Sequence, residues 1–230
     1  MHHCLPFRSA HPVEVLTIQN VVTDTRDPFG IKSDDDQYHL GSGTYKLGAN
    51  TYISGTISVD AGKTVTIDLN GKSLDRCLQS VGKTGSVINV WKGGKLTIID
   101  SSPTGGGTIT GGFTANRGGG IYCDGKLTLN NVTIENNSAP KGGGIFGAES
   151  SEVTISGRTK INRNTARDEN GGGIYLGEKA EMDYKMRCTH LTVSGGNIYC
   201  NSAKRGTVLY YVSGSDYKFV YGVQYNGTIY

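Results

Sequence analysis

The sequence predicts an all-β chain, wound into a single-stranded parallel β-helix (a solenoid) of about six coils with an N-terminal cap. Three observations support this prediction. Glycine supplies 35 of the 230 residues, short sequence phrases recur in a fixed order, and apolar residues alternate with polar ones over three to five positions. Such alternation is typical of short strands with one buried face. A helix bundle is excluded because each glycine costs about 1 kcal/mol in a helix interior.

The clearest repeat is a glycine-rich phrase that ends in an aliphatic residue and is followed by an aromatic one. It occupies residues 118–121, 142–145 and 171–174, with a weaker copy at 206–209. The aromatic residues that follow it are Tyr122, Phe146, Tyr175 and Tyr210. The offsets between copies are 24, 29 and 35 residues. A unit of that length suits one coil with three short strands and three turns.

Two further phrases cycle with the first. An apolar residue followed three positions later by asparagine precedes each glycine phrase, and an apolar-Thr-apolar triplet recurs in the same order. The threonines are Thr66, Thr97, Thr128, Thr154 and Thr192. Successive side chains of a strand face opposite sides, so these threonines point outward while their apolar neighbours fill the coil.

The glycines and asparagines of the repeats are predicted to be structural. Glycine suits a bend at which the backbone takes a positive φ or approaches a neighbouring coil closely. Asparagine tolerates the left-handed conformation, and its amide can bond to the asparagine of the next coil. The residues assigned to this structural ladder are Asn116, Asn137, Asn164, Asn201, Gly119, Gly143 and Gly172.

The repeats divide the chain into three parts. Residues 1–43 lie outside the cycle and are predicted to form an N-terminal cap or leader segment, because the open end of a solenoid has to be covered. Residues 44–209 form the parallel β-helix. Residues 210–230 are rich in tyrosine and are predicted to form a C-terminal coil or cap.

The paired glycine and asparagine phrases resemble the passenger repeats of chlamydial polymorphic outer-membrane proteins, and are similar to β-helical repeats of other bacterial surface proteins. The segments 43–47 and 65–71 are similar to the first coils of such domains. The resemblance implies a right-handed β-helix, secretion to the extracellular space or cell surface, and a role in adhesion. The first 30 residues show no secretory signal, and no anchor or translocator follows, so we expect a domain excised from a longer protein.

Charge and composition exclude several classes of function. The 23 basic and 20 acidic residues leave a net charge of +3. This charge is too small to indicate a nucleic-acid-binding protein. The chain has no run of 18 apolar residues, so we expect no membrane span in it. No Cys-x-x-Cys pair is present, and we expect neither a metal nor a cofactor. The five cysteines are interpreted as small buried residues, with a contact between Cys188 and Cys200 as the alternative.

The leading functional hypothesis is a non-catalytic adhesin-type domain that binds an extracellular glycan or a host or community protein. The contacts would come from the insertion at residues 177–187 and from exposed tyrosines, because such rings stack on ligands. The tyrosines assigned to this role are Tyr184, Tyr217, Tyr221 and Tyr225.

The alternative is a carbohydrate-active enzyme, either a polysaccharide lyase or a glycoside hydrolase, with its site on an outward sheet face. A hydrolase needs two carboxylates about 5–9.5 Å apart, and a lyase needs a base. The carboxylates for these roles are Asp168, Glu169 and Asp183, and Arg167 is the basic candidate.

Overall fold

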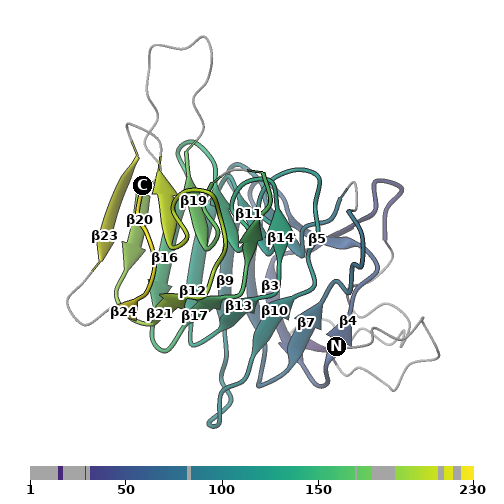
Figure 1. Cartoon of the computed structure of the whole chain (residues 1–230). Coiled ribbons are helices and arrows are strands. Elements are labelled where there is room, and N and C mark those ends of the chain that lie inside the picture. The colour runs from purple at the N-terminus through teal and green to yellow at the C-terminus, as the bar shows by residue number, and fades with distance from the viewer. Residues whose placement is uncertain are drawn as a thin grey trace.

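The computed structural model describes residues 15–17, 29, 32–81, 84–168, 170–177, 190–211, 215–219 and 224–230. In this part of the chain the regular structure consists of short β-strands, stacked as successive coils along one axis (Figure 1). No helix long and apolar enough to cross a bilayer occurs among these residues.

Three sheets run along the axis, and we call them sheets A, B and C. Sheet A contains, in spatial order, β1 (Val15–Thr17), β3 (Gly43–Leu47), β6 (Thr64–Asp68), β9 (Lys95–Ile99), β12 (Lys126–Asn130), β16 (Glu152–Ser156), β20 (His190–Val193) and β23 (Asp216–Phe219). Sheet B contains β2 (Gln37–His39), β5 (Thr56–Val59), β8 (Ile88–Val90), β11 (Ile121–Cys123), β15 (Ile145–Gly147), β19 (Ile174–Leu176) and β22 (Leu209–Tyr211). Sheet C contains β4 (Thr51–Tyr52), β7 (Ser73–Asp75), β10 (Thr108–Thr110), β13 (Thr133–Glu135), β17 (Lys160–Asn162), β21 (Asn197–Tyr199) and β24 (Gln224–Tyr225).

Each coil contributes one strand to sheet A, then one to sheet C, then one to sheet B. Coils 1 to 6 begin at β3, β6, β9, β12, β16 and β20, and β23 starts a further one. A short pair, β14 (Ser138–Ala139) and β18 (Thr165–Ala166), joins the turns of coils 4 and 5. All pairings between coils are parallel. The predicted all-β parallel β-helix of about six coils is therefore confirmed.

The core is a set of stacked aliphatic columns. In sheet B, Ile88, Ile121 and Ile145 pair directly and are fully buried. In sheet A, Leu127 pairs with Val153, and both are 1% exposed. The threonine between the apolar residues points outward in each coil, so the column of threonines lies on the outer face of sheet A. Apolar burial of this kind contributes about 25 cal/mol per Å² and holds the coils together.

An asparagine column follows the strands of sheet C. The backbone N–H and the Nδ2 of Asn137 both donate to Oδ1 of Asn164, each at 3.1 Å. Asn164 makes the same pair of bonds to Oδ1 of Asn201, at 3.0 and 3.1 Å. Asn137 and Asn164 thus each join their own coil to the next one.

Asn116 lies outside this column, although its sequence phrase predicts it there. The pairing of Ile109 with Ile134 places Gly112 opposite Asn137, and the N–H of Gly112 donates to Oδ1 of Asn137 at 3.0 Å. The apolar residue that begins the phrase in this coil is therefore Ile109, because strand pairing decides the register. Asn116 is exposed in the following turn.

The second glycine of each triplet lies where a neighbouring coil leaves no room for a Cβ atom. A Cβ on Gly119 would lie 2.5 Å from the carbonyl oxygen of Gly143, and one on Gly143 would lie 2.5 Å from the carbonyl carbon of Thr165. A Cβ on Gly172 would lie 2.6 Å from the carbonyl oxygen of Ser202. Close approach of the backbones therefore requires glycine at these positions.

Both ends of the stack carry additional contacts. At the N-terminal end, β1 pairs with β3 in the antiparallel sense, and the ring of Phe29 lies 6.4 Å from Tyr38 and 6.1 Å from Tyr45. At the other end, β23 and β24 pair in parallel with β20 and β21. The division of the chain at residues 43 and 209 stays a prediction.

The cysteines differ from the expectation of five small buried residues. Cys77 is disulfide-bonded. Cys200 is free and exposed, whereas Cys4 and Cys188, the partner in the alternative interpretation, lie outside the described residues. Cys123 is free and buried, and burial raises the pKa of its thiol to about 12. Among these, only Cys123 is placed as the sequence interpretation expects.

Candidate functional site

An aromatic column runs along the outer face of sheet B. Tyr122, Phe146, Tyr175 and Tyr210 occupy the same position in successive coils. Their ring centroids are separated by 5.7, 5.0 and 5.0 Å, and the rings are stacked with interplanar angles of 5°, 13° and 25°. Offset stacking at these distances is favourable beyond the burial of area. The regular repeat thus produces a continuous strip of stacked aromatic rings outside the core.

Trp91 extends this strip toward the N-terminal end. Its ring centroid lies 5.6 Å from that of Tyr122, at an interplanar angle of 53°. The indole Nε1 donates a hydrogen bond of 2.8 Å to Oγ of Ser58, in the preceding coil. Trp91 remains 38% exposed, whereas Phe146 and Tyr175 are 0% and 5% exposed. The strip is therefore open at Trp91 and covered farther along.

Two cations contribute to this cover. The guanidinium carbon of Arg117 lies 5.4 Å from the centre of the Phe146 ring, and Nζ of Lys141 lies 5.7 Å from that of Tyr175. Both contacts have cation–π geometry. Gly118, next to Arg117, takes a φ of 69°, and this left-handed turn returns the chain to sheet B. Each cation thereby reaches over the aromatic residue of the next coil.

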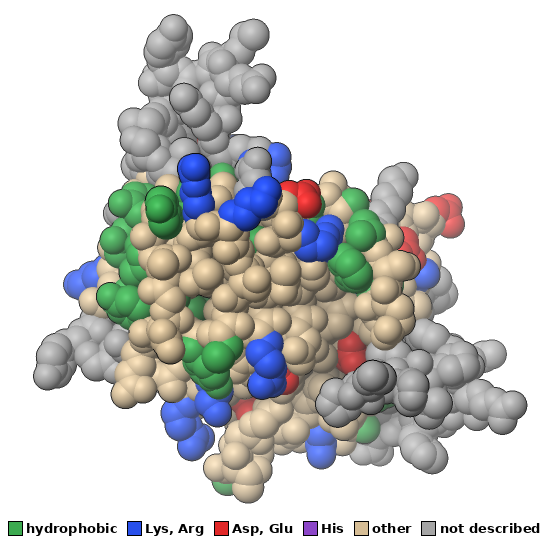
Figure 2. Space-filling view, in the orientation of Figure 1, with side chains coloured by type: hydrophobic (Ala, Val, Ile, Leu, Met, Phe, Trp, Pro, Cys, Tyr) green, Lys and Arg blue, Asp and Glu red, His purple; other side chains and the backbone are tan. Residues whose placement is uncertain are grey.

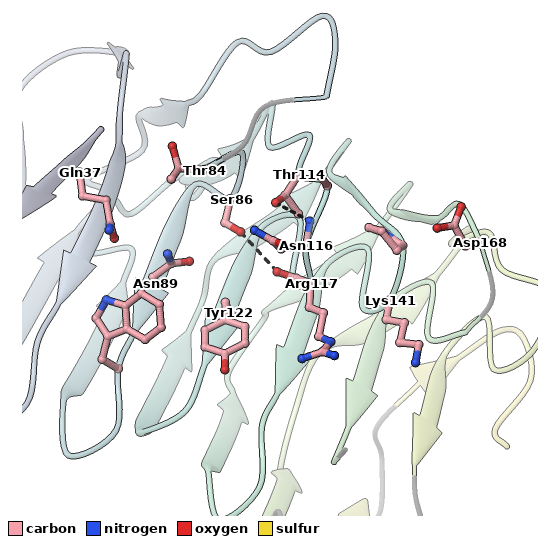
Figure 3. Close-up of a pocket in the computed structure, with 13 residues that line it drawn as sticks. Gln37, Thr84, Ser86, Asn89, Thr114, Asn116, Arg117, Tyr122, Lys141 and Asp168 are labelled. Atoms are coloured by element: carbon pink, nitrogen blue, oxygen red, sulfur yellow. Dashed lines mark hydrogen bonds between the residues drawn. The ribbon is translucent and has the colours of Figure 1, made fainter. Parts of the chain in front are cut away.

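A groove of about 600 Å³ opens beside the exposed end of the strip (Figure 3). The residues that line it are Gln37, Thr84, Ser86, Asn89, Trp91, Thr114, Ala115, Asn116, Arg117, Tyr122, Pro140, Lys141 and Asp168. The side chains of Arg117 and Lys141 point to the same side as the Tyr122 ring (Figure 3). Aromatic rings, amides and cations therefore face one hollow on the outer surface.

The turn that carries Asn116 and Arg117 is fixed by local bonds. The N–H of Asn116 donates to Oγ1 of Thr114 at 3.0 Å, and Oγ of Ser86 donates to the carbonyl oxygen of Arg117 at 3.4 Å. The backbone of Arg117 forms a parallel bridge with that of Lys141. The two cationic residues therefore occupy equivalent backbone positions in successive coils.

Arg167, the basic residue of the enzyme hypothesis, joins the turns of three coils. Its Nη1 donates to Oγ of Ser138 at 2.9 Å, and its Nη2 donates to the carbonyl oxygen of Thr114 at 2.6 Å. The guanidinium carbon lies 4.5 Å from the centre of the Phe113 ring. Partial burial lowers the pKa of Arg167, and the charge of Asp168 opposes that shift. Through these contacts Arg167 holds the turns at Ser138 and Thr114 together, and Thr114 is one of the residues that line the groove.

The remaining enzyme candidates are only partly placed. Asp168 is exposed and lines the groove, while Glu169 and Asp183 lie outside the described residues. Asp168 is the one carboxylate among the residues that line the groove in the described part of the chain. The ligand-binding candidates Tyr184 and Tyr221 also lie outside the described residues.

Tyr217 and Tyr225 lie far along the stack from the groove. They are 39% and 51% exposed, but they pair with Leu191 and Ile198, which face the core. The centroid of the Phe219 ring lies 5.7 Å from that of Tyr217 and 5.4 Å from that of Tyr225. Their register therefore places them over the last core residues and not on the outer face of a sheet.

A chain of polar groups connects Trp91 with a titratable residue. Oγ of Ser58, which accepts from Trp91, donates to Asp60 at 2.8 Å, and the other oxygen of Asp60 lies 2.8 Å from Nδ1 of His39. Nε2 of His39 lies 3.3 Å from Asp35. The hydrogen bond with Asp60, followed by the charges of the two carboxylates, raises the pKa of His39.

The aromatic residue after each glycine phrase is visible in the sequence, and one aromatic residue per coil at a fixed strand position is enough to predict such a column. The contribution of Trp91 was not available, since it follows a strand of coil 2 that carries no glycine triplet.

Comparison with known proteins supports the resemblance of the repeats to those of polymorphic membrane proteins. Residues 131–148 match the repeat of the Chlamydia polymorphic membrane protein family. An alignment of 83 residues is 35% identical to the probable outer membrane protein pmp20 of Chlamydia pneumoniae, and it covers 33% of this chain and 5% of that protein. No solved structure matches the chain. The chain therefore carries repeats of the polymorphic-membrane-protein type, and it spans a small part of the relative's length.

Proposed function

We propose that this chain is a non-catalytic, adhesin-type β-helical domain, displayed extracellularly or on the cell surface, which binds a glycan in the groove beside Trp91. The likeness to a bacterial outer membrane protein supports the surface location. A rod of paired backbone also suits an exposed position, because few of its segments can open locally to proteases.

The observation that carries the glycan assignment is the exposed indole of Trp91, which lies beside Tyr122 in the lining of the groove. The weakly polar C–H face of a pyranose packs on such rings, which bury a large area at a low cost in side-chain entropy. Asn89 and Asn116 add amide donors and acceptors at the same hollow, which suits hydroxyl groups. A few polar groups around an apolar floor are typical of ligand sites.

The proposal is tested by measuring binding of the purified chain to a panel of immobilised polysaccharides. Trp91→Ala removes the most exposed ring of the groove, and we expect about tenfold weaker binding, the equivalent of one good aromatic contact. Tyr52→Ala is the matched control, because Tyr52 is 56% exposed and lies on β4 of sheet C. A Trp91→Ala protein that is folded and binds as tightly as the parent would refute the assignment.

A carbohydrate-active enzyme is the second candidate, supported by the exposed carboxylate of Asp168 in the lining of the groove. Asp168→Asn would then abolish release of reducing or unsaturated ends from a polysaccharide. A non-catalytic domain releases neither product, with or without the substitution.

A further inference from the structure

We propose that the groove takes an anionic polysaccharide, bearing uronate or sulfate groups, whose chain lies along the axis of the β-helix. This inference rests on the proposed function, because it specifies the charge and the direction of the glycan at the same site.

The direction follows from a column of polar residues beside the aromatic strip. Arg117 bridges to Lys141, and Asn170 bridges to Arg205. The N–H of Gly142 donates to the carbonyl oxygen of Asn170, which connects the two pairs. The four positions therefore rise one coil at a time, at about 4.8 Å per coil, and three of them are cations. A sugar ring in an extended polysaccharide is roughly as long as one coil, so a chain laid along the axis passes the three cations in turn, while Asn170 is buried.

The charge follows from the lining of the groove. Among the described residues that line the groove, Arg117 and Lys141 contribute two positive charges and Asp168 one negative charge, which gives these residues a formal charge of +1. Lys and Arg side chains gather along this edge of the molecule, near β11 and β14 (Figure 2). Guanidinium groups bind carboxylates and sulfates through paired, charge-assisted hydrogen bonds. Acidic groups on the sugar would therefore pair with the positive charges of Arg117 and Lys141 in the groove.

The floor distinguishes a glycan from other polyanions. Trp91 and Tyr122 belong to successive coils, so their rings form a short track in the direction of the axis. A sugar ring can pack on the exposed part of the Trp91 indole while its acidic substituents point toward Arg117 and Lys141. Duplex DNA presents its phosphates outside its stacked bases and brings no comparable apolar face to the floor.

The first experiment compares a charged and an esterified polymer of the same backbone, and adds a sulfated polysaccharide and DNA. Calorimetric titration of the full chain uses polygalacturonate, highly methyl-esterified pectin, heparin and duplex DNA. We expect polygalacturonate or heparin to bind at least tenfold more tightly than the methyl-esterified polymer and than DNA. Binding should weaken as the salt concentration rises, because the cations lose part of their electrostatic attraction. The stronger of the two acidic polymers identifies carboxylate or sulfate as the preferred group.

The second experiment changes the charge of the wall. Arg117→Gln and Lys141→Gln should each weaken binding of the acidic polymer about five- to tenfold, as expected for the loss of a charge-assisted contact. Asp168→Asn should strengthen it about two- to fivefold by removing a repelling charge, and this variant alters neither cation–π contact. Lys160→Gln, on β17 of sheet C, is the control and should leave binding unchanged.

The outcomes separate this inference from the proposed function. If methyl-esterified pectin binds as well as polygalacturonate, and Trp91→Ala weakens both, the glycan site stands and its preference for anions is refuted. Equal binding of DNA, or no response to the three charge substitutions, refutes the inference as well. If no polysaccharide of either charge binds the folded chain, both proposals fall.

Discussion

Asn137 donates two hydrogen bonds to one atom, Oδ1 of Asn164, from its backbone N–H and from its Nδ2. Asn164 is fully buried and repeats the arrangement toward Asn201 while its Nδ2 also bonds to the carbonyl oxygen of Ile134. One amide thereby satisfies polar groups of three coils at a turn where strand pairing is interrupted. An unsatisfied buried group costs about 1–3 kcal/mol.

Asn164→Ala is expected to lower the free energy of unfolding by about 2–4 kcal/mol, because it leaves buried groups of two neighbouring coils without partners. Asn116→Ala is the matched control from the same sequence phrase, and we expect a change within about 0.5 kcal/mol because Asn116 is exposed. Urea unfolding followed by circular dichroism measures both. Equal losses in the two variants would contradict the observed register of the asparagine column.

Gly143→Ala is expected to cost about 2–4 kcal/mol of stability, since the added Cβ would lie 2.5 Å from a backbone atom of Thr165 in the next coil. Gly41→Ala serves as the control, because the nearest atom to a Cβ there, the hydroxyl oxygen of Tyr45, is 3.8 Å away, an ordinary van der Waals distance. Thermal unfolding compares the two proteins. A neutral Gly143→Ala substitution would mean that the coils can separate locally at little cost.

The pKa of His39 is expected to lie above its usual value of 6.5, and stability should follow it. A raised folded-state pKa gives a contribution that is fully present below the unfolded pKa and is lost as the pH rises through the folded pKa. The unfolding free energy of the parent should therefore fall relative to that of His39→Gln as the pH rises from about 6.5 through the raised pKa of His39. NMR titration of the imidazole measures the pKa directly, and a value at or below 6.5 would contradict the contact with Asp60.

The same titration should be visible at Trp91. It is the one tryptophan of the chain, and the hydrogen bonds through Ser58 and Asp60 connect its indole to His39. We expect the tryptophan fluorescence to change with the apparent pKa of His39, and to lose this dependence in Asp60→Asn. Persistence of the transition in that variant would assign it to another group.

Arg167→Gln is expected to destabilise the chain by about 1–3 kcal/mol, because its guanidinium bonds to the turns at Ser138 and Thr114. Arg163→Gln is the control, since Arg163 forms an exposed ion pair with Glu135 and such pairs contribute about 0–1 kcal/mol. Chemical unfolding measures both. If Arg167→Gln leaves stability unchanged but abolishes an activity on polysaccharide, that result favours the enzyme hypothesis over the non-catalytic domain.

The architecture could be predicted from the sequence because a stacked coil repeats its constraints. Each coil needs aliphatic residues at the positions that pair with the coil below, as in Leu127 and Val153, and glycine where backbones meet, as at Gly143. These demands recur once per coil and appear as periodic phrases. The site was less predictable. Neither Asp168 nor Trp91 belongs to a phrase, and the candidates Tyr217 and Tyr225 were chosen by composition, without knowledge of their register.

The sequence by itself determined that the chain forms parallel coils, about how many there are, and which side chains face inward, since strand alternation and repeat length depend on local order alone. The tertiary structure alone decided which residues share a surface. Stacking placed Gly112, and not Asn116, opposite Asn137 in the asparagine column. It brought Trp91 beside Tyr122 of the next coil. It also placed Arg117 and Lys141 above the aromatic rings of their neighbours. The physical reason is that pairing between coils sets these neighbours, and pairing depends on turn lengths that differ from one repeat to the next.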